Sequence, residues 1–476
     1  MNILFFGIGQ FYRKRKSVWE NICSGDEVLG FVDNRAKEIG MFEGKPVYLP
    51  AEILSISFDA VILMSVSVIE MREQLLSLGV PSEKIYYWGQ YVEQFIAQTQ
   101  QWLPKLHETH CTPKGRILIV SSGLSIGGGI LASCYAAELL VERGYEVTLA
   151  APSGDESFLA RLREAGVNAW ILPGLPFLQW NRVETMHSFD AAIVCFFQNM
   201  HVAYELSLRM PTIWWVHEPR AVYHPFYRVT RYCFPALDTP AWMGRLRIVA
   251  VSKMAQQNFE DYYPHQTNGV LALGEPDTAS THPGWKAHLP VRFAVLGAVI
   301  ENKGQDLFLQ AALRMPKDLR ESSEFFIVGA GSKGSSIYQR CQKILLKLPQ
   351  AHNLGWQPPE MVAALLPTID VIVCASLEET MSMPIIEGMM HGKICITTDM
   401  TGVAAYIDNG QNGFVVKAGD VDALAHCMME VHQHMGELQS MREAARKTYE
   451  QNFTMEAFGN RLEAELHAAM MTKMRR

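Results

Sequence analysis

At 476 residues the chain is long enough for about three domains, since one domain commonly takes roughly 100–200 residues. Its net charge of −7 argues against a general nucleic-acid-binding protein, which would be basic, and 49% hydrophobic with 19% charged residues is typical of a globular protein. Nine cysteines without a Cys-x-x-Cys pair favour free thiols in a reducing cytoplasm. We find neither a signal-peptide pattern nor a run of the roughly 18 apolar residues that spans a bilayer, which favours a cytoplasmic protein with at most peripheral contact at the inner face of a membrane.

Residues 1–95 are expected to form a small Rossmann-like leader domain. The apolar stretch Ile3-Leu-Phe-Phe6 predicts a strand, and the glycine turn Gly7-Ile-Gly9 follows it. A second predicted strand, 28–32, ends in front of Asp33. Glycines after a first strand and an acid after a second are typical of dinucleotide-binding domains. An oxidoreductase that binds NAD(P) or a nucleotide sugar through this domain is therefore one alternative for the function.

Two features of the leader point elsewhere. Tyr12 stands at the third glycine position of the dinucleotide pattern, where its side chain would obstruct close packing of helix on strand. The segments Gly30-Phe-Val-Asp-Asn34 and Gly44-Lys-Pro-Val47 resemble the Rossmann-like leader domains that precede catalytic domains in some sugar-modifying enzymes. That resemblance implies a regulatory or docking domain, or a nucleotide-sugar pocket.

A linker helix is expected at 96–113, followed by a second α/β domain at 114–280. This domain opens with a strand at 116–120, a glycine-rich loop that ends at Gly128 and Gly129, and a helical pattern. Strand, glycine loop and helix suit a phosphate cradle, because only glycine lets the backbone come that close to a ligand. An ordinary strand-to-helix connection is the alternative.

His217 directly follows the apolar strand Thr212-Ile-Trp-Trp-Val216. At the carboxyl end of a strand, a histidine can hydrogen-bond a sugar hydroxyl or a developing charge. The alternative is a core histidine satisfied by the backbone. Between Arg220 and Arg247, aromatic and basic residues are mixed, which suits a carbohydrate or lipid-phosphate acceptor, a membrane surface, or an ordinary amphipathic helix.

A polar, proline-bearing hinge near 278–290 precedes a second doubly wound domain, placed at 281–455, and a C-terminal helix at 456–476. In this domain a strand ending at Leu296 leads into Gly297 and a loop that carries Lys303. Further on, the short strand from His352 reaches Gly355, where backbone atoms would approach a nucleotide base.

The stretch Ser376–Gly392 carries the strongest signal. It follows the apolar strand 370–375, and its helix is expected to begin near Pro384, whose fixed φ is already helical. A helix N-terminus at the carboxyl end of a parallel strand favours anions such as phosphate. Two carboxylates stand beside it: Glu379 in the loop, and Glu387, expected in the first helical turn. Both suit acceptance of hydrogen bonds from ligand hydroxyls; a first-turn acid that stabilises the helix is the alternative for Glu387.

Glu379-x7-Glu387, with Pro384 between, resembles the signature of retaining glycosyltransferases of family 4, also called group 1, which have the GT-B architecture. The resemblance implies two doubly wound Rossmann-like domains that face a cleft, here preceded by the leader. It implies that Glu379 faces the donor sugar and that Glu387 binds the nucleotide ribose. The backbone N–H groups of the turn, here at Ser382 and Met383, would hold the pyrophosphate.

Other motifs of that family occur in the same order over roughly residues 115–455. The resemblance implies that His217 supports the donor sugar from the opposite domain, that the Gly128-Gly129 pair lies beside the donor phosphates, and that Gly355 lies near the base. Gly297 and Lys303 match the family's Gly-Arg-x-x-x-x-Lys-Gly pattern, but Ala298 occupies the arginine position and cannot supply a bidentate clamp on phosphate.

The sequence therefore predicts a retaining glycosyltransferase that moves a sugar from a nucleotide-diphosphate donor to a glycan or lipid-linked acceptor in surface polysaccharide biosynthesis. It predicts no metal and no cofactor apart from the donor substrate. Asp420 and Asp422 are interpreted as helix-start acids rather than as metal ligands. Besides the oxidoreductase, a non-catalytic scaffold that keeps the transferase fold is the second alternative, because Ala298 weakens the phosphate site.

Overall fold

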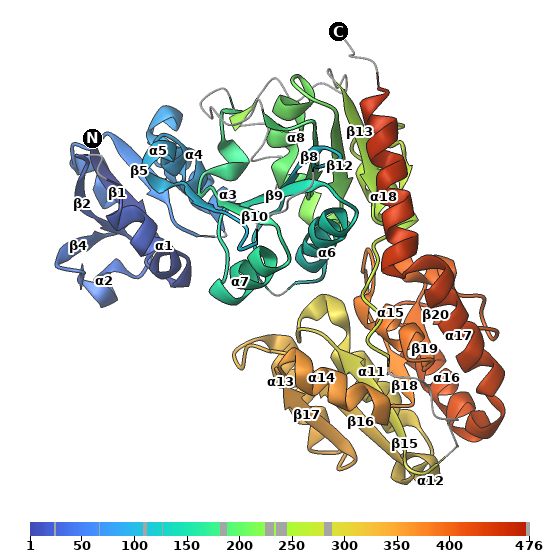
Figure 1. The fold of residues 1–476 in the computed structure, drawn as a ribbon. Helices are drawn as coiled ribbons and strands as arrows, with labels where there is room; N and C mark the ends of the chain where they lie inside the picture. The colour runs from blue at the N-terminus through green and yellow to red at the C-terminus, as the bar shows by residue number, and fades with distance from the viewer. Residues whose placement is uncertain are drawn as a thin grey trace. The chain divides into compact units, whose positions relative to one another are not determined.

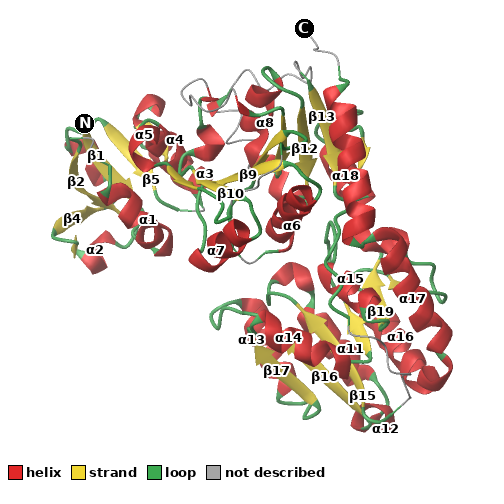
Figure 2. Ribbon diagram, in the orientation of Figure 1, coloured by secondary structure: helices red, strands yellow, loops and turns green. Residues whose placement is uncertain are grey.

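The computed structural model describes residues 1–22, 25–65, 67–107, 112–125, 127–180, 188–223, 233–234, 245–279 and 288–472. Three β-sheets carry the fold (Figures 1 and 2). The chain divides into two compact units, which are described separately. The first comprises Met1–Trp214, Ala221–Arg247 and Leu466–Arg476, and the second comprises Trp215–Arg220 and Ile248–Glu465.

The leader sheet has the order β3-β4-β2-β1-β5-β6 and is parallel except for the β3–β4 pair. Its strands are β1 (Asn2–Phe6), β2 (Glu27–Val32), β3 (Met41–Phe42), β4 (Lys45–Tyr48), β5 (Ala60–Leu63) and β6 (Ile85–Tyr87). Its helices are α1 (Gln10–Glu20), α2 (Ala36–Ile39) and α3 (Val68–Ser77). The first two predicted strands are confirmed. Each is a short apolar run between turn residues, so its position along the chain could be predicted from the sequence.

Tyr12 does not obstruct the packing of α1, contrary to expectation. Its side chain is 1% exposed and fills the leader core, with its ring 5.7 Å from that of Phe5 and 5.3 Å from that of Phe31. The hydroxyl donates to Glu43 Oε2 at 3.0 Å, so the buried polar atom is satisfied. The helix therefore packs on the sheet through an aromatic side chain where the dinucleotide pattern would use a glycine.

The expected linker helix at 96–113 is wrong for its described part. After α4 (Trp88–Glu93), the chain forms only the short helix α5 (Ile96–Thr99) and then the strand β7 (Gln101–Leu103). Trp102 packs edge-on against Trp170 at 5.6 Å, and β7 pairs antiparallel with β10 (Asn168–Ile171). Pro104 follows, which cannot donate the hydrogen bond that a continuing helix needs.

The second sheet has the order β14-β13-β12-β11-β8-β9-β10-β7. Its other strands are β8 (Arg116–Val120), β9 (Glu146–Ala151), β11 (Ala191–Cys195), β12 (Thr212–Val216), β13 (Leu246–Ala250) and β14 (Gly269–Val270). Helices in this part of the chain include α6 (Gly128–Glu142), α7 (Glu156–Glu164), α8 (Met200–Ser207) and α10 (Lys253–Glu260). Every residue of β11 and β12 is buried, which explains their continuous apolar sequences.

Several predictions lie outside the described residues: most of the aromatic and basic stretch between Arg220 and Arg247, the centre of the hinge at 280–287 and the basic end at 473–476. Within the aromatic stretch, Tyr223 is fully buried, with its ring 4.5 Å from that of Phe197. That tyrosine is a core residue. Among the described residues, no helix combines the length and apolar character needed to cross a membrane.

The third sheet, β17-β16-β15-β18-β19-β20, is parallel throughout. Its strands are β15 (Val291–Leu296), β16 (Ser323–Val328), β17 (Ala351–Gly355), β18 (Val371–Val373), β19 (Ile394–Thr398) and β20 (Phe414–Val416). Its helices are α11 (Gln305–Arg314), α12 (Lys317–Glu321), α13 (Ser336–Leu345), α14 (Pro359–Leu365), α15 (Met383–Met390), α16 (Val421–His434) and α17 (Gln439–Asn452). The last helix, α18 (Met455–Met470), begins in the second unit, and its residues from Leu466 on belong to the first. This doubly wound sheet was predicted.

Both faces of the third sheet are covered. Helix α11 lies between α13 and α16, and together they bury a core that includes Phe293, Phe308 and Met428. Helix α15 packs on β18 and β19 from the other face, where a Cβ on Gly388 would lie 2.9 Å from Cys395 Sγ. The strand order reverses between β15 and β18, and such a switch point is where ligands bind in open α/β sheets.

Candidate active site

The loops that follow β15 and β18 meet at the switch point of the third sheet. Gly304 ends the first loop with φ = +63°, and a Cβ there would lie 2.2 Å from the carbonyl oxygen of Ala375. Leu377 N donates to Asn302 O at 2.9 Å, and Asn302 Nδ2 donates to Glu378 O. The close contact therefore requires glycine and holds the two loops together.

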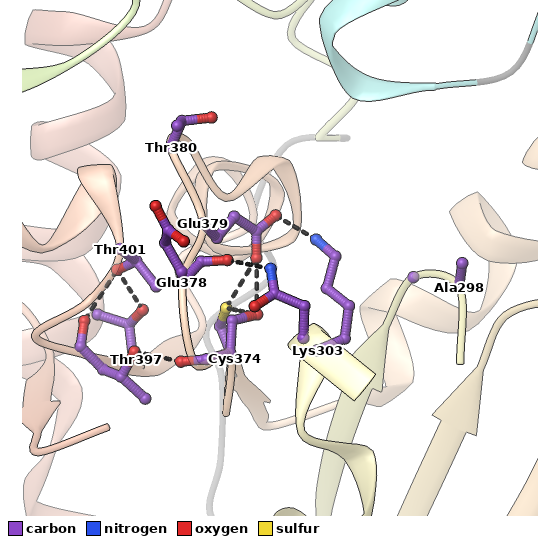
Figure 3. A network of polar contacts seen from close by, with 12 residues as sticks. Ala298, Lys303, Cys374, Glu378, Glu379, Thr380, Thr397 and Thr401 are labelled. Carbon is purple, nitrogen blue, oxygen red and sulfur yellow. Dashed lines mark hydrogen bonds and ion pairs between the residues drawn. The ribbon is translucent and has the colours of Figure 1, made fainter. Parts of the chain in front are cut away.

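The Glu379 carboxylate is surrounded by hydrogen-bond donors from both loops (Figure 3). Lys303 Nζ forms an ion pair with Oε1, and the Ser376 hydroxyl donates to Oε2 at 2.8 Å. Cys374 Sγ lies 3.3 Å from the same Oε2. Burial raises the pKa of the Cys374 thiol to about 11, so that it stays protonated and can donate. The structure thus brings together Glu379 and Lys303, two of the three residues predicted to be catalytic.

The backbone of Glu379 is fixed as firmly as its side chain. Its N–H donates to Met400 O at 2.9 Å, and its carbonyl accepts from Gly402 N at 2.8 Å. A Cβ on Gly402 would lie 1.8 Å from the carbonyl oxygen of Thr380, so only glycine allows this contact. Thr401 Oγ1 lies 2.8 Å from Thr397 Oγ1, at the end of β19. These bonds hold the carboxylate on a rigid frame.

His217 belongs to the same compact unit as Glu379, not to the opposite one as expected. Thr380 Oγ1 donates to His217 O at 2.6 Å. The neighbouring Glu378 Oε1 accepts from Arg220 N at 2.6 Å and from Asn258 Nδ2 at 2.9 Å. The segment 215–220 comprises the last two residues of β12 and the residues that follow the strand. These contacts bind it to the Glu379 loop, which explains why it belongs to the second unit.

The imidazole of His217 is 7% exposed and lies against the Trp215 ring at 4.4 Å. Burial lowers the pKa of His217 to about 3. The ring is therefore neutral at any physiological pH. A neutral imidazole can hydrogen-bond a hydroxyl but is a poor general base, so the structure narrows the chemical roles open to this histidine.

Glu387 lies just beyond the first turn of α15 and not within that turn, where it was expected. Helix α15 begins at Met383, with Pro384 as its second residue, and no acidic residue stands in its first turn. Glu387 therefore does not serve as the first-turn acid that stabilises the start of this helix. Glu387 is partly exposed, and its carboxyl is hydrogen-bonded to that of the buried Glu275. Burial raises the pKa of Glu387 to about 7 and that of Glu275 well above its ordinary value.

The other predicted binding residues lie on separate elements. Ser382 is buried at the N-cap position of α15, which begins at Met383, but its side chain makes no capping hydrogen bond. Gly297 follows β15 with φ = +121°, and Gly355 ends β17 with φ = +66°, where its carbonyl accepts from Gly329 N at 2.7 Å. Gly128 and Gly129 are the first two residues of α6, which belongs to the first unit.

Ala298 leaves no side-chain contact toward the carboxylate network, as Figure 3 shows. Its carbonyl accepts from Gln305 Nε2 at 2.9 Å. Next to it, a cavity of about 400 Å³ lies at the carboxyl ends of β15 and β16; it is lined by Val299, Ile300, Glu301, Ala330, Gly331, Ser332, Ser335, Ser336 and Ile337.

Within the described ranges, no three His, Cys, Asp or Glu side chains are placed to hold a metal ion. Asp420 accepts from Ala423 N at 2.9 Å as the N-cap of α16, which confirms its structural interpretation.

Sequence reasoning missed several polar residues of this site. Cys374, Ser376 and Glu378 stand inside the stretch that was singled out, but nothing in the spacing shows which of them would face Glu379. Asn302 precedes the predicted lysine. Glu275 had no signal at all, because it follows an ordinary apolar run and meets Glu387 only through the tertiary fold.

Two parts of the chain match known protein families. The family described as Glycosyl transferases group 1 matches residues 290–434, and the family C2185-like, N-terminal, matches residues 1–86. Over 252 residues the chain is 23% identical to a putative colanic acid biosynthesis glycosyltransferase of Salmonella typhimurium, covering 50% of this chain and 57% of that protein. It is 26% identical over 140 residues to UDP-Gal:alpha-D-GlcNAc-diphosphoundecaprenol alpha-1,3-galactosyltransferase of Escherichia coli, covering 29% and 36%. The chain thus spans about a third to just over half of these relatives.

The fold is GT-B. The crystal structure of Anabaena HepE in complex with UDP and glucose superimposes with a TM-score of 0.61 at 16% identity and covers 74% of this chain and 100% of HepE. Because the identity is so low, this likeness concerns the fold alone. The leader precedes the part of the chain that resembles the transferases, in agreement with the predicted fold class.

Proposed function

We propose that this protein is a retaining glycosyltransferase that moves a sugar from a nucleotide-diphosphate donor to a glycan or lipid-linked acceptor, in surface polysaccharide biosynthesis. The observation that carries the proposal is the pairing of Lys303 with Glu379 at the switch point of the third sheet. The group 1 family match over residues 290–434, which contain both residues, supports it. So do the activities for which the relatives are named, which concern colanic acid and diphosphoundecaprenol-linked sugars.

The proposed chemistry is mainly the stabilisation of charge. As the sugar leaves, negative charge develops on the nucleotide diphosphate, and a preorganised cation with backbone N–H groups is the usual means of stabilising it. Lys303 supplies the cation, and the N-terminus of α15 at Ser382 and Met383 supplies the N–H groups and the positive end of the helix dipole. This assignment needs no arginine at position 298.

Glu379 orients the donor sugar by accepting hydrogen bonds from its hydroxyls, and Glu387 binds the nucleotide ribose. His217, neutral and fixed to the Glu379 loop through Thr380, contributes a hydrogen bond to the sugar and no proton transfer. Because Oε2 of Glu379 is already bound by Ser376 and Cys374, this carboxylate is better suited to orienting the sugar than to attacking it. Retention then follows from attack of the acceptor on the same face, assisted by the departing phosphate.

The cavity at the carboxyl ends of β15 and β16, lined by Val299 and Gly331 among others, is the proposed place for part of the nucleotide. No metal and no further cofactor enters this scheme. The acceptor domain, with Gly128 and Gly129, is proposed at 114–280, and peripheral membrane contact is proposed for a lipid-linked acceptor.

The test is thermal stabilisation of the full chain by a panel of nucleoside diphosphates, nucleotide sugars and NAD(P)H. A ligand at 100 times its Kd stabilises by about 2.7 kcal/mol, which shifts a melting point visibly. Lys303→Ala is expected to abolish the shift, whereas Lys317→Ala, at an exposed lysine of the same unit, is the matched control and leaves it unchanged. Stabilisation by NAD(P)H alone would refute the transferase; nucleotide binding without consumption of any nucleotide sugar would favour a scaffold.

A further inference from the structure

The two chain neighbours of Glu379 both bind the segment that carries His217. Thr380 Oγ1 donates to His217 O at 2.6 Å, and Arg220 N donates to Glu378 Oε1 at 2.6 Å. These bonds reach the first and the last residue of the short run from His217 to Arg220, which is called the His217 segment below. The loop that carries Glu379 therefore holds this segment at both of its ends.

The local backbone explains why neighbouring side chains serve different partners. The backbone at Glu379 forms an isolated parallel β-bridge, so it is extended there. Successive side chains of an extended chain point to opposite sides. The Glu379 carboxylate is directed at Lys303, whereas the side chains of Glu378 and Thr380 point away from that lysine (Figure 3). One extended stretch thus offers a carboxylate to the Lys303 loop and another to the His217 segment.

Glu378 joins more of the site than the His217 segment alone. The same Oε1 also accepts from Asn258 Nδ2 at 2.9 Å, and Asn258 lies on α10 with 5% of its surface exposed. The Glu378 carbonyl accepts from Asn302 Nδ2, in the loop that carries Lys303. Through its side chain and its backbone, Glu378 connects the segments of all three residues that are predicted to be catalytic.

The His217 segment is stiff enough to transmit this contact. Pro219 has a fixed φ, and the residue before a proline is restricted to extended conformations. That residue, Glu218, is 7% exposed, and its Oε2 accepts from His217 N at 2.9 Å. The place of His217 is therefore set by the place of Arg220 N, which Glu378 fixes.

We propose that Glu378 is a positioning residue: its carboxylate holds the His217 segment so that the imidazole stands beside the sugar that Glu379 orients. The proposal rests on the proposed function, since it needs a donor sugar in the site. It gives Glu378 no contact with the donor or with the reacting atoms. A carboxylate suits this task, because its hydrogen bonds are roughly twice as strong as those of a neutral acceptor.

Hydrogen exchange tests the structural part without any ligand. The exchange rate of the Arg220 amide is measured on the full chain, wild type and variants. Glu378→Leu keeps the bulk but has no acceptor, so exchange should be about tenfold faster or more. Glu378→Gln keeps an oxygen acceptor, and its rate should stay within about threefold of wild type. Glu360→Leu, at an exposed glutamate of the same unit, is the matched control. An unchanged rate in Glu378→Leu overturns the proposal.

Calorimetry on the same variants tests the role in sugar recognition. UDP with UDP-glucose, GDP with GDP-mannose and ADP with ADP-glucose are titrated, and the Kd of each diphosphate is divided by that of its sugar form. In Glu378→Leu this ratio should fall by about three- to tenfold, because a hydrogen bond to the sugar is lost while diphosphate binding is retained. Glu378→Gln should restore the wild-type ratio. A wild-type ratio in Glu378→Leu overturns the proposal.

A double-mutant cycle separates action through His217 from a general disturbance of the Glu379 loop. His217→Leu alone should lower the ratio as much as Glu378→Leu does, and the double variant should lower it no further. Additive effects would show that Glu378 acts without His217 and would overturn the proposal.

Thr380→Val releases the other end of the His217 segment at nearly constant volume, so it should also lower the ratio. It carries the test if Glu378→Leu does not fold, and a wild-type ratio in Thr380→Val then overturns the proposal. The expected exchange rates in a protein that binds none of these nucleotides have a different meaning. They confirm that Glu378 holds the segment and refute the proposed function, and with it the role in sugar recognition.

Discussion

Replacing Ser376 with alanine tests the Glu379 site most directly. The Ser376 hydroxyl donates to Glu379 Oε2 at 2.8 Å and is 1% exposed, while Thr398 Oγ1 holds the Ser376 carbonyl at 2.7 Å. The substitution therefore removes one donor and leaves the backbone in place. Cys374, a weak thiol donor, remains alone on that oxygen.

A hydrogen bond to a charged group contributes about 1.5–3 kcal/mol, and each 1.36 kcal/mol of barrier is tenfold in rate. We expect kcat to fall by about 10- to 150-fold in Ser376→Ala. The KM for the donor is expected to stay within about threefold, because Lys303 and the α15 N-terminus still bind the diphosphate. The split between kcat and KM follows from the role of Glu379 in orienting the sugar rather than in holding the nucleotide.

The assay is steady-state consumption of the nucleotide sugar that stabilises wild type most, with the unfolding free energy of each variant measured in parallel. Ser323→Ala is the matched control: Ser323 is also 1% exposed and lies in the same unit, but its hydroxyl donates to Leu319 O at 2.8 Å. Its kcat should match wild type. If Ser376→Ala keeps kcat within threefold, or changes only KM, the donors around Glu379 do not set its function.

Three further outcomes are expected. Gly402→Ala places a methyl group 1.8 Å from Thr380 O, so it should cost at least about 2 kcal/mol of unfolding free energy in urea titration and abolish turnover; wild-type behaviour would contradict the close contact. His217→Gln should leave the shape of the kcat–pH profile unchanged, because the histidine pKa of about 3 keeps it neutral; loss of a titration near pH 6.5 would show that it transfers protons. The pKa of Glu387 is raised from 4.5 to about 7, so the folded state holds a proton that the unfolded chain releases, and stability should fall by up to about 3 kcal/mol as pH rises across that window. Glu387→Gln should reduce this slope in denaturation measured from pH 4 to 8, and an equal slope would exclude Glu387 as its source.

The predicted elements that the structure confirms are those whose sequence alone restricts them. The strands 116–120 and 212–216 are short, apolar and bounded by turn residues, and they were predicted to the residue. The helix 421–434 was marked by its N-cap at Asp420. By contrast, β7 has only three residues, and Trp102 in this strand packs against Trp170 of β10. The local sequence does not reveal that contact, because the two tryptophans are far apart in the chain. Domain boundaries at 95, 113, 280 and 455 stay predictions.

The candidate site divides in the same way. The spacing of Glu379 and Glu387 was visible in the sequence. The loop position of Glu379 is confirmed, whereas Glu387 lies on the predicted helix but beyond its first turn. Their electrostatic surroundings were not visible, because they depend on contacts between distant segments. Glu387 meets Glu275 across more than a hundred residues of chain, and the His217 segment is bound by Glu378 and Thr380. The same limit explains why Tyr12 was misjudged: its phenol fills a core whose shape the glycine pattern does not describe.

The missing arginine at position 298 has a consequence for how the site would operate. Lys303 is paired with Glu379 Oε1, while Ser376 and Cys374 hold Oε2. A diphosphate that binds Lys303 competes with Glu379 Oε1 for the ammonium group, and where Lys303 turns to the phosphate Oε1 is released while Ser376 and Cys374 hold Oε2 in place. We expect this exchange to make Glu379 available to sugar hydroxyls only when the diphosphate is bound. With an arginine at 298, the phosphate would have a second cation and the exchange would be less strictly coupled. Ala298→Arg should then tighten diphosphate binding, measured by calorimetry, and weaken the dependence of sugar recognition on the diphosphate; an unchanged Kd would show that this position does not face the phosphates.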